Sequence, residues 1–306
     1  MKPLDCLIFA GAQDAQAKRV LKEMRRIGGR VRLFDTNTFP GSPAASIEEG
    51  ALRLGRAAML IPHNAWLRGL AFHPLMPGSD GNLALRPRGW IAQCDEKRAM
   101  IESLIRLLAL RGTRLVNSLE ANALHSQKPL QLALLHRAGV PVPRSLATND
   151  PAAVRGFART LKRVVYKPLS GGAEVLELSA EDLTEARLGS LATAPVLFQE
   201  YIAGLAVRAY VLGRKVLGAA AIEAATLDYR ADEAAALRPV KLTAEERSVM
   251  IRSATASGMH FAGIDFIRQT KGISVLDINP SPMFAVFEGR TGIDIAGPLA
   301  KWMCRR

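Results

Sequence analysis

Hydrophobic residues near the N-terminus follow a strand, helix and strand pattern. Leu4 to Ala10 is an apolar run, and Ala15 to Ile27 repeats apolar residues at helical spacing until Gly28-Gly29. Val31 to Phe34 is apolar again. This βαβ pattern predicts the start of a small parallel sheet. No Gly-x-Gly-x-x-Gly motif follows the first strand, so the pattern does not predict a dinucleotide site.

Residues 36–95 are rich in Pro, Gly and Arg and predict mainly loops, with one short apolar run from Ala58 to Ile61. Cys94 to Arg111 then has the periodicity of a helix, and Leu115 to Asn117 predicts a short strand. Five residues of the loop region could meet a substrate, although a solvated loop explains each one as well: Arg68, His73, Arg86, Arg88 and Trp90.

The rest of the chain alternates predicted helices with paired strands, which gives an α/β fold class overall. The predicted helices are Asn122–Ala138, Pro151–Leu161, Thr243–Ser257 and Ile293–Met303. The predicted strands before Thr243 are Val164–Leu169, Glu174–Leu178, Val196–Ile202, Ala206–Leu212 and Lys215–Ile222. Val140 to Pro143, a Val-Pro-Val-Pro segment, predicts an extended linker.

Acidic and amide side chains accompany two further apolar runs near the C-terminus. Asp265 lies in the run Gly263 to Ile267, and Asp277 and Asn279 alternate along the next run, so both point to one face of a strand. Carboxylate and carboxamide oxygens are ligands suited to Mg²⁺. These residues also serve ordinary strand ends and turns, and taken alone the two interpretations are equally good.

A lysine precedes a glycine-containing loop in the middle of the chain. Lys167 leads into a loop with Gly171 and Gly172, whose small residues would let backbone N–H groups approach phosphate oxygens. A plain β-turn is the simpler interpretation of the glycines, but a lysine beside them favours phosphate. Lys128, earlier in the chain, would by itself be a surface lysine.

Three further segments carry polar groups. The strand edge formed by Gln199, Glu200, Tyr201 and Ile202 could offer backbone groups to a purine. Arg208 on the following strand, and Arg230 in a later loop, could each steady phosphate charge.

The order of these features resembles the ATP-grasp superfamily, and most closely the RimK-type carboxylate–amine (α-L-glutamate) ligases. The resemblance covers residues 116–303 and is most specific in the run from Asp277 to Pro282 and from Phe287 to Ala296. It implies an ATP-grasp fold with a smaller N-terminal α/β domain that carries a parallel sheet. The implied domains are residues 1–115, residues 116–202 (the central and lid subdomain) and residues 203–306 (the C-terminal subdomain with the metal site).

The resemblance also implies roles for individual positions. Lys128 and Lys167 would contact ATP phosphates or the adenine edge, and Gly171 and Gly172 would form the mobile glycine loop. The adenine pocket would be lined by Gln199, Glu200, Tyr201 and Ile202. The two arginines with implied catalytic roles are Arg208, at the phosphate or acyl-phosphate, and Arg230, at the γ-phosphate. The Mg²⁺ ligands, which could also hold Mn²⁺, would be Asp265, Asp277 and Asn279.

Three positions depart from the pattern of the RimK-type ligases. Val207 stands where an acidic residue is usual, and Asp277 stands where glutamate is commoner. An arginine found late in the hairpin of the family is replaced near Glu223. The departures leave the ATP half of the expected site intact and put the choice of substrate in doubt.

Composition narrows the possible partners. The 306 residues carry a net charge of +13, which favours an acidic partner such as a nucleotide or a polycarboxylate. The charge is dispersed and aromatic residues are few, so nucleic acid is disfavoured. No apolar run reaches the roughly 20 residues of a membrane span. Three widely spaced cysteines indicate a reducing compartment, so we expect a cytoplasmic protein.

The expected reaction joins a carboxylate to an amine. ATP would phosphorylate the carboxylate, and the amine would then displace phosphate to leave an amide and ADP. The substrates would be a small-molecule or peptide carboxylate and an amino acid, with glutamate added to a cofactor precursor or a peptide end. The resemblance also implies a homo-oligomer. An ATP-binding regulatory or scaffold protein without ligase turnover is the alternative, motivated by Val207 and Asp277.

Overall fold

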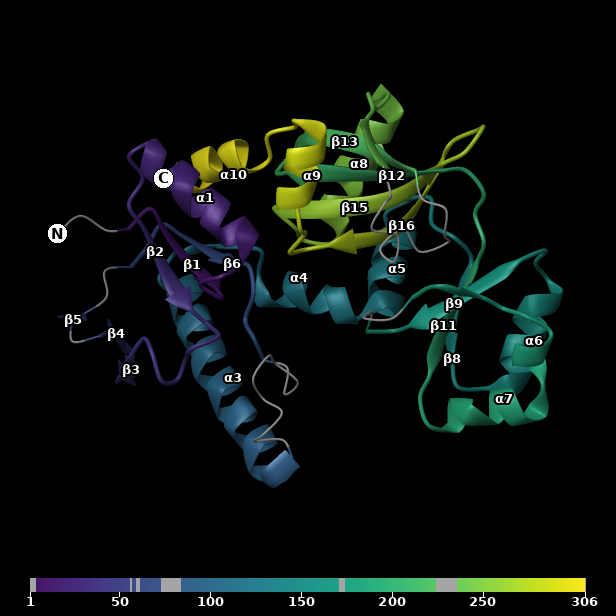
Figure 1. Cartoon of the computed structure of the whole chain (residues 1–306), viewed down its shortest axis with the longest axis horizontal. Helices are drawn as coiled ribbons and strands as arrows, with labels where there is room; N and C mark the ends of the chain where they lie inside the picture. The colour runs from purple at the N-terminus through teal and green to yellow at the C-terminus, as the bar shows by residue number, and fades with distance from the viewer. Residues whose placement is uncertain are drawn as a thin grey trace. The chain divides into compact units, whose positions relative to one another are not determined.

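The computed structural model describes residues 4–55, 57–58, 61–72, 84–170, 174–223 and 236–305 (Figure 1). The chain divides into two compact units. The first contains residues Met1–Leu119, Met283–Ala285 and Asp294–Arg306, and the second contains Glu120–Pro282 and Val286–Ile293.

A four-stranded parallel sheet forms the centre of the first unit. Its strands lie in the order β2-β1-β6-β7 and span Val31–Asp35, Cys6–Ala10, Asn64–Leu67 and Arg114–Val116. Every residue of β1 is buried, as expected of a central strand covered on both faces. The predicted βαβ start and the parallel sheet are therefore confirmed.

Helices cover both faces of this sheet. Leu7 and Phe9 of β1 share a core cluster with α3 (Pro87–Leu110). On the other face the Cys6 sulfur lies 3.8 Å from the sulfur of Met303 in α10 (Ala296–Met303). α10 packs beside α1 (Ala15–Arg26), which begins where the Asp14 carboxylate accepts a hydrogen bond from a backbone N–H of its first turn.

All three tryptophans of the chain belong to the first unit. Trp66 is buried on β6, and Trp90 lies on α3. Trp302 lies on α10 under the guanidinium of Arg114, 3.8 Å from its ring centre. The indole and the guanidinium form a cation–π pair.

Residues 36–95 contain more regular structure than the sequence predicts. A small antiparallel sheet is formed by β3 (Ala45–Glu48), β4 (Ala51–Leu54) and β5 (Ala57–Ala58), and β6 joins the parallel sheet. The expected loop placement of Arg88 and Trp90 is wrong, because α3 begins at Pro87. Proline at a first helical position lacks only an N–H that has no helical partner, which permits this early start.

The second unit holds two antiparallel sheets. The smaller has the order β10-β9-β11-β8. Its strands span Leu176–Glu177, Val164–Pro168, Val196–Glu200 and Ser145–Thr148. Two helices, α6 (Pro151–Arg159) and α7 (Glu185–Gly189), pack on it around Val154, Leu188 and Phe198. The described part of the second unit also has three short 3₁₀ turns: Leu124–Ser126, Glu181–Leu183 and Ser190–Ala192.

The larger sheet has the order β14-β13-β12-β15-β16. Its strands span Ala236–Pro239, Lys215–Glu223, Leu205–Leu212, Phe261–Arg268 and Ile273–Asn279. One face packs against α8 (Ala244–Ala256), and α9 (Ala285–Thr291) follows the last strand. Thr243 and Glu246 form a reciprocal capping box that fixes the start of α8.

The helix predicted over Asn122–Ala138 is interrupted, so that prediction is wrong in one respect. α4 (Leu119–Ala123) ends in a 3₁₀ turn, and α5 (Lys128–Arg137) starts anew after Gln127. Pro129 occupies one of the first two positions of α5, where it is tolerated, whereas it would disturb the interior of one long helix. Lys128 is consequently the first residue of α5. No helix in the described ranges is long and apolar enough to cross a membrane.

Candidate functional site

The three residues expected to hold a metal lie on two neighbouring strands. Asp265 on β15 is the direct cross-strand partner of Asp277 on β16, and Asn279 follows two residues later. Because side chains alternate along a strand, the two carboxylates and the carboxamide share one face of the sheet. All three are partly exposed.

Lys128 lies at one end of this group. Its side chain is buried, and its ammonium donates a hydrogen bond to Oδ1 of Asp277. Burial acts to raise the pKa of Asp277, but the charges of Lys128 and Lys167 and the hydrogen bond from Lys128 outweigh it, so the pKa is lowered. Asp277 is therefore an anion at neutral pH, and two lysines with implied phosphate roles lie near it.

Gln131, one turn after Lys128, fixes the strand that carries the site. Its Nε2 donates to the backbone oxygen of Ile278 at 2.7 Å, and its Oε1 accepts from the backbone N–H of Ile278 at 3.1 Å. Ile278 lies between Asp277 and Asn279, so this amide clamp sets the position of both. Gln131 was not predicted from the sequence, because its only local signal is that of a polar residue in an apolar stretch, three positions after Lys128.

Arg208 makes a two-pronged ion pair with Asp265. Its Nε lies 2.7 Å from Oδ1 and its second terminal nitrogen lies 2.6 Å from Oδ2. Arg208, Asp265 and Asp277 are consecutive cross-strand partners on β12, β15 and β16. The fork geometry holds the carboxylate plane in one orientation.

Tyr210 supports this pair from the same face of β12. The residue is fully buried, and its hydroxyl and Arg208 are hydrogen-bonded. Burial raises the pKa of Tyr210 to about 12, so the hydroxyl stays protonated at neutral pH. Its ring packs edge-on against Phe287, with ring centres 4.7 Å apart. Sequence reasoning gave Tyr210 no role, because its partners come from distant segments.

Gly263 explains how the turn after Asn279 fits over the sheet. A Cβ atom at this glycine would lie 2.6 Å from Cβ of Pro282, closer than any real side chain allows. The backbone N–H of Ser281 donates to Oδ1 of Asn279 at 2.9 Å, which holds the turn from inside. Asn279 therefore holds this turn and also lies on the same face of the sheet as the two other candidate metal ligands, Asp265 and Asp277.

The smaller sheet carries the residues with implied nucleotide roles. Lys167 on β9 is the cross-strand partner of Leu197 on β11, and so faces the same side as Leu197. Gln199 is buried and donates to the hydroxyl of Ser145 at 3.0 Å. The backbone N–H of Glu200 donates to the backbone oxygen of Arg144 at 2.9 Å, which ties β11 to the start of β8.

Contacts with Arg163 fix the segment that follows β11. The backbone N–H of Tyr201 donates to the oxygen of Arg163 at 3.1 Å, and the guanidinium of Arg163 lies 3.7 Å from the centre of the Tyr201 ring. Arg163 in turn forms a two-pronged pair with Glu177 at 2.8 and 2.7 Å. Ile202 follows, partly exposed, outside the strand.

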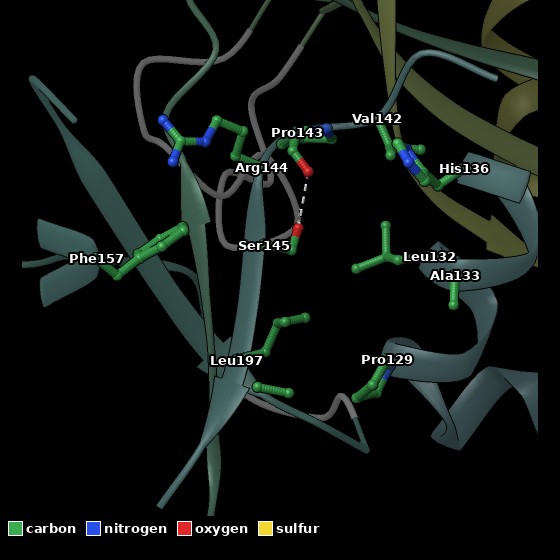
Figure 2. Close-up of a pocket in the computed structure, with 11 residues that line it drawn as sticks. Pro129, Leu132, Ala133, His136, Val142, Pro143, Arg144, Ser145, Phe157 and Leu197 are labelled. Atoms are coloured by element: carbon green, nitrogen blue, oxygen red, sulfur yellow. Dashed lines mark hydrogen bonds between the residues drawn. The ribbon is translucent and has the colours of Figure 1, made fainter. Parts of the chain in front are cut away.

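A cavity of about 510 Å³ lies between α5 and this sheet. Figure 2 shows Pro129, Leu132 and Ala133 on the helix side, opposite Ser145 and Leu197 on the strands. Its lining is mainly apolar, and Leu197 belongs to the face that carries Lys167. An apolar cavity with few polar groups is typical of a small-ligand site.

Some expected residues cannot be placed. Arg230, Gly171, Gly172 and the earlier loop candidate His73 lie outside the described residues. The two other departures from the RimK pattern do lie within them. Val207 is buried in the core cluster beneath α8, on the face opposite Arg208, and Glu223 pairs with Arg238 at 3.0 Å.

The donor set fits Mg²⁺ in its chemistry. Asp265, Asp277 and Asn279 offer only oxygen atoms, from one face and from adjacent strand positions. Within the described ranges no group of three or more His, Cys, Asp and Glu could hold a metal, and this set reaches three members only through the carboxamide of Asn279. Both carboxylates are paired with cations, so a metal would share them with Lys128 and Arg208.

The RimK-like ATP-grasp domain matches residues 125–303. A curated relative, a probable alpha-L-glutamate ligase of Teredinibacter turnerae, is 31% identical over 214 residues, which cover 66% of this chain and 70% of the relative.

Solved structures resemble the chain over nearly its whole length. The ATP-grasp ligase PsnB complexed with a phosphomimetic variant of a minimal precursor, Mg and ADP has a TM-score of 0.91 and 33% identity, and the match covers 98% of this chain and 97% of PsnB. PsnB complexed with the precursor peptide PsnA2 and AMPPNP has a TM-score of 0.85 and 33% identity, with 99% and 98% covered.

Proposed function

Since the chain belongs to the RimK-like ATP-grasp ligases, we propose that it uses ATP and Mg²⁺ to activate a carboxylate of a peptide substrate and join it to an amine. One observation carries the choice of a peptide. The similarity to PsnB, which was solved with precursor peptides, includes both units of this chain at 33% identity.

The reaction needs positioning and charge neutralisation rather than a protein nucleophile. The peptide carboxylate attacks the γ-phosphorus of ATP and ADP leaves; the amine then attacks the acyl carbon, loses a proton and expels phosphate. The charges of Lys128 and Lys167 both act on Asp277, and the two ammonium groups would neutralise the phosphates of ATP. Orientation of the carboxylate toward the phosphate supplies the remaining rate advantage.

The metal ligands and their supports would act together. When bound, Mg²⁺ neutralises phosphate charge as the bond to the leaving group breaks. Asp265, Asp277 and Asn279 would hold it, Arg208 would keep the Asp265 carboxylate in one orientation, and Gln131 would fix the backbone between the other two. In this role Arg208 is a positioning residue.

The nucleotide would use the face of the smaller sheet. Lys167 shares this face with Leu197, and the cavity between α5 and the sheet adds an apolar surface next to it. The base would lie along Gln199, Glu200, Tyr201 and Ile202, as the family resemblance implies. Gly171 and Gly172 would close over the phosphates and exclude water from the acyl-phosphate.

The test is a turnover measurement with defined acceptors. Purified protein is given Mg-ATP and synthetic peptides that contain glutamate and lysine side chains, and ADP and peptide mass are followed. A peptide ligase releases ADP only with peptide and yields a product lighter by one water than its reactants. ATP binding without ADP release from any mixture would contradict the proposal and favour an ATP-binding regulator.

Glutamate addition is the second candidate, favoured by the names of the curated relatives. The same experiment separates the two reactions when free glutamate is included. A product heavier by one glutamyl residue, or by several, would identify a glutamate ligase. A product unchanged by free glutamate would favour joining within or between peptides.

A further inference from the structure

The outer surface of α8 contains a hollow of about 650 Å³. Most of its lining comes from α8, with Ala138 from the end of α5 and Arg214 from the turn between β12 and β13. The lining residues are Ala138, Arg214, Ala244, Arg247, Ser248, Ile251, Arg252, Thr255 and Ala256. We call this surface the α8 hollow.

All charged side chains that line the α8 hollow are positive. Its lining includes Arg214, Arg247 and Arg252, all exposed, and no carboxylate. Arg247 donates to the backbone oxygen of Leu242, and neither Arg214 nor Arg252 has an ion pair with any residue that the structure describes. Three like charges around one hollow repel one another, and an anionic partner would relieve this repulsion.

The nearest buried acid on α8 is used elsewhere. Glu246 accepts two hydrogen bonds from Arg268, at 2.6 and 2.8 Å, and also takes part in the capping box with Thr243. It is buried, so its charge is directed to Arg268 rather than to the hollow. The lining of the α8 hollow therefore holds three guanidinium groups and no carboxylate, and the exposed Glu245 of α8 is not among its lining residues.

The uncharged residues that line the hollow are mainly apolar. Small side chains at Ala138, Ala244 and Ala256 leave room beside Ile251. The hydroxyl of Thr255 is turned back to the oxygen of Ile251 at 2.8 Å, which adds to the apolar character. A lining that combines apolar side chains with three guanidinium groups matches a peptide that carries an apolar side chain between carboxylates, better than it matches a lone phosphate.

The hollow lies behind the sheet that carries the candidate site. Ala262, Ile264 and Phe266 pack with α8 in one core cluster, so Asp265 between them points to the opposite face. The same alternation directs Val207 and Ala209 toward α8 and Arg208 away from it. A partner in the hollow would leave the catalytic face of the sheet open.

We propose that the α8 hollow binds an acidic segment of the peptide substrate, outside the portion that reacts. The proposal rests on the proposed peptide ligase function for its biological meaning, but binding itself requires no turnover. Such a second contact would raise the local concentration of the reacting portion near the site.

Binding is tested by fluorescence anisotropy with a labelled synthetic peptide in which a central leucine is flanked on each side by glutamates. The proposal predicts saturable binding to the full chain without ATP, and binding about tenfold weaker or worse for the same peptide with glutamines. No binding of the glutamate peptide, or equal binding of both peptides, would overturn it.

Two sets of variants locate the contact. Arg214→Ala, Arg247→Ala and Arg252→Ala together remove three charges of the hollow. Arg159→Ala, Lys162→Ala and Lys271→Ala together remove three exposed charges elsewhere in the second unit. We expect the first set to weaken binding about tenfold or more and the second to change it less than twofold. Equal weakening by both sets would show a diffuse attraction and refute a defined site.

A further variant separates binding from folding and from catalysis. Ile251→Glu places a carboxylate in the lining at a partly exposed position, and we expect it to weaken binding of the glutamate peptide at least as much as the triple substitution does. Unchanged circular dichroism and unchanged ADP release with a short peptide lacking the acidic segment establish that the fold and the site are intact. Loss of ADP release from the wild-type chain with every peptide would instead refute the proposed function and leave the binding result standing.

Discussion

In the five-stranded sheet the charged residues of the candidate site form ion pairs above a large core, whereas the antiparallel four-stranded sheet carries Lys167 above a smaller core and beside a cavity. Asp277 is paired with Lys128, and Asp265 with Arg208, which Tyr210 supports. Beneath them lies the larger core, with nineteen buried residues in one cluster among those described, against five for the smaller sheet.

The difference indicates that the two sheets have different roles. Metal ligands need fixed oxygen atoms, and a large core with cross-strand partners supplies them. A nucleotide face that must admit and release ligand needs less packing, because local opening is easier where few apolar groups are buried. The smaller core, the adjacent cavity and the exposed Arg163–Glu177 pair are consistent with this second role.

Asp277→Asn is the change with the largest expected effect. It removes the charge that faces Lys128 and the candidate metal, so ADP release should fall about 100-fold or more. It also leaves the buried ammonium without its carboxylate, which should lower the free energy of unfolding by about 3 kcal/mol. Coupled ADP assays across Mg²⁺ concentrations and urea unfolding measure both effects.

Glu177→Gln is the matched control on the smaller sheet. Both members of its ion pair are largely exposed, so the melting temperature and ADP release should stay within error of the wild type. If the two variants behaved alike, the proposed contrast between the sheets would be wrong.

Phenylalanine to alanine in each core compares the sheets directly. Phe266 is 1% exposed in the larger core and Phe198 is 3% exposed in the smaller one. We expect Phe266→Ala to cost about 4–5 kcal/mol and Phe198→Ala about 3 kcal/mol, because the smaller core can collapse further into the space. Urea unfolding followed by far-ultraviolet circular dichroism measures the difference, and a larger cost at Phe198 would reverse our interpretation.

Each sheet also has a tyrosine hydroxyl that can be removed without loss of the ring. Tyr210→Phe removes the hydrogen bond with Arg208, and we expect about tenfold slower ADP release with a higher Mg²⁺ requirement. Tyr166, whose hydroxyl lies 3.3 Å from Asp182, is the comparison. Tyr166→Phe should leave the Mg²⁺ requirement unchanged, and an equal shift in both would show a general effect on folding.

Acid should remove the stabilising contribution of the Asp277 carboxylate in the wild type. The pKa of Asp277 is lowered in the folded chain, so its ionised form stabilises the fold above its ordinary value, and that contribution is lost as pH falls through the lowered value. We expect the melting temperature of the wild type to fall toward that of Asp277→Asn below about pH 4. A constant difference between them down to strong acid would contradict this assignment.

The parts of the fold and the site that depend on local sequence pattern could be predicted. Alternation along β16 placed Asp277 and Asn279 on one face, and the apolar runs identified the strands of the parallel sheet that begin and end the first βαβ unit. Such signals depend only on neighbours in the chain.

The remaining features depend on contacts between distant segments. Gln131 meets Ile278 across 147 positions and Arg208 meets Asp265 across 57, and no periodicity reports such pairs. The early start of α3 was hidden by the surrounding Pro, Gly and Arg residues, and the break before Lys128 depends on Pro129. Strand β8 is short and only partly buried, so its alternation is weak.

Tryptophan and tyrosine residues lie in different units of the chain, so each unit has its own spectroscopic signal. All three tryptophans lie in the first unit, and all four tyrosines lie in the second. Indole emission therefore reports on the parallel sheet and its helices, while the phenol absorption band reports on the second unit, whose described tyrosines are Tyr166, Tyr201 and Tyr210. A single sample of the unlabelled protein can thus show whether the two units lose their structure together or one after the other.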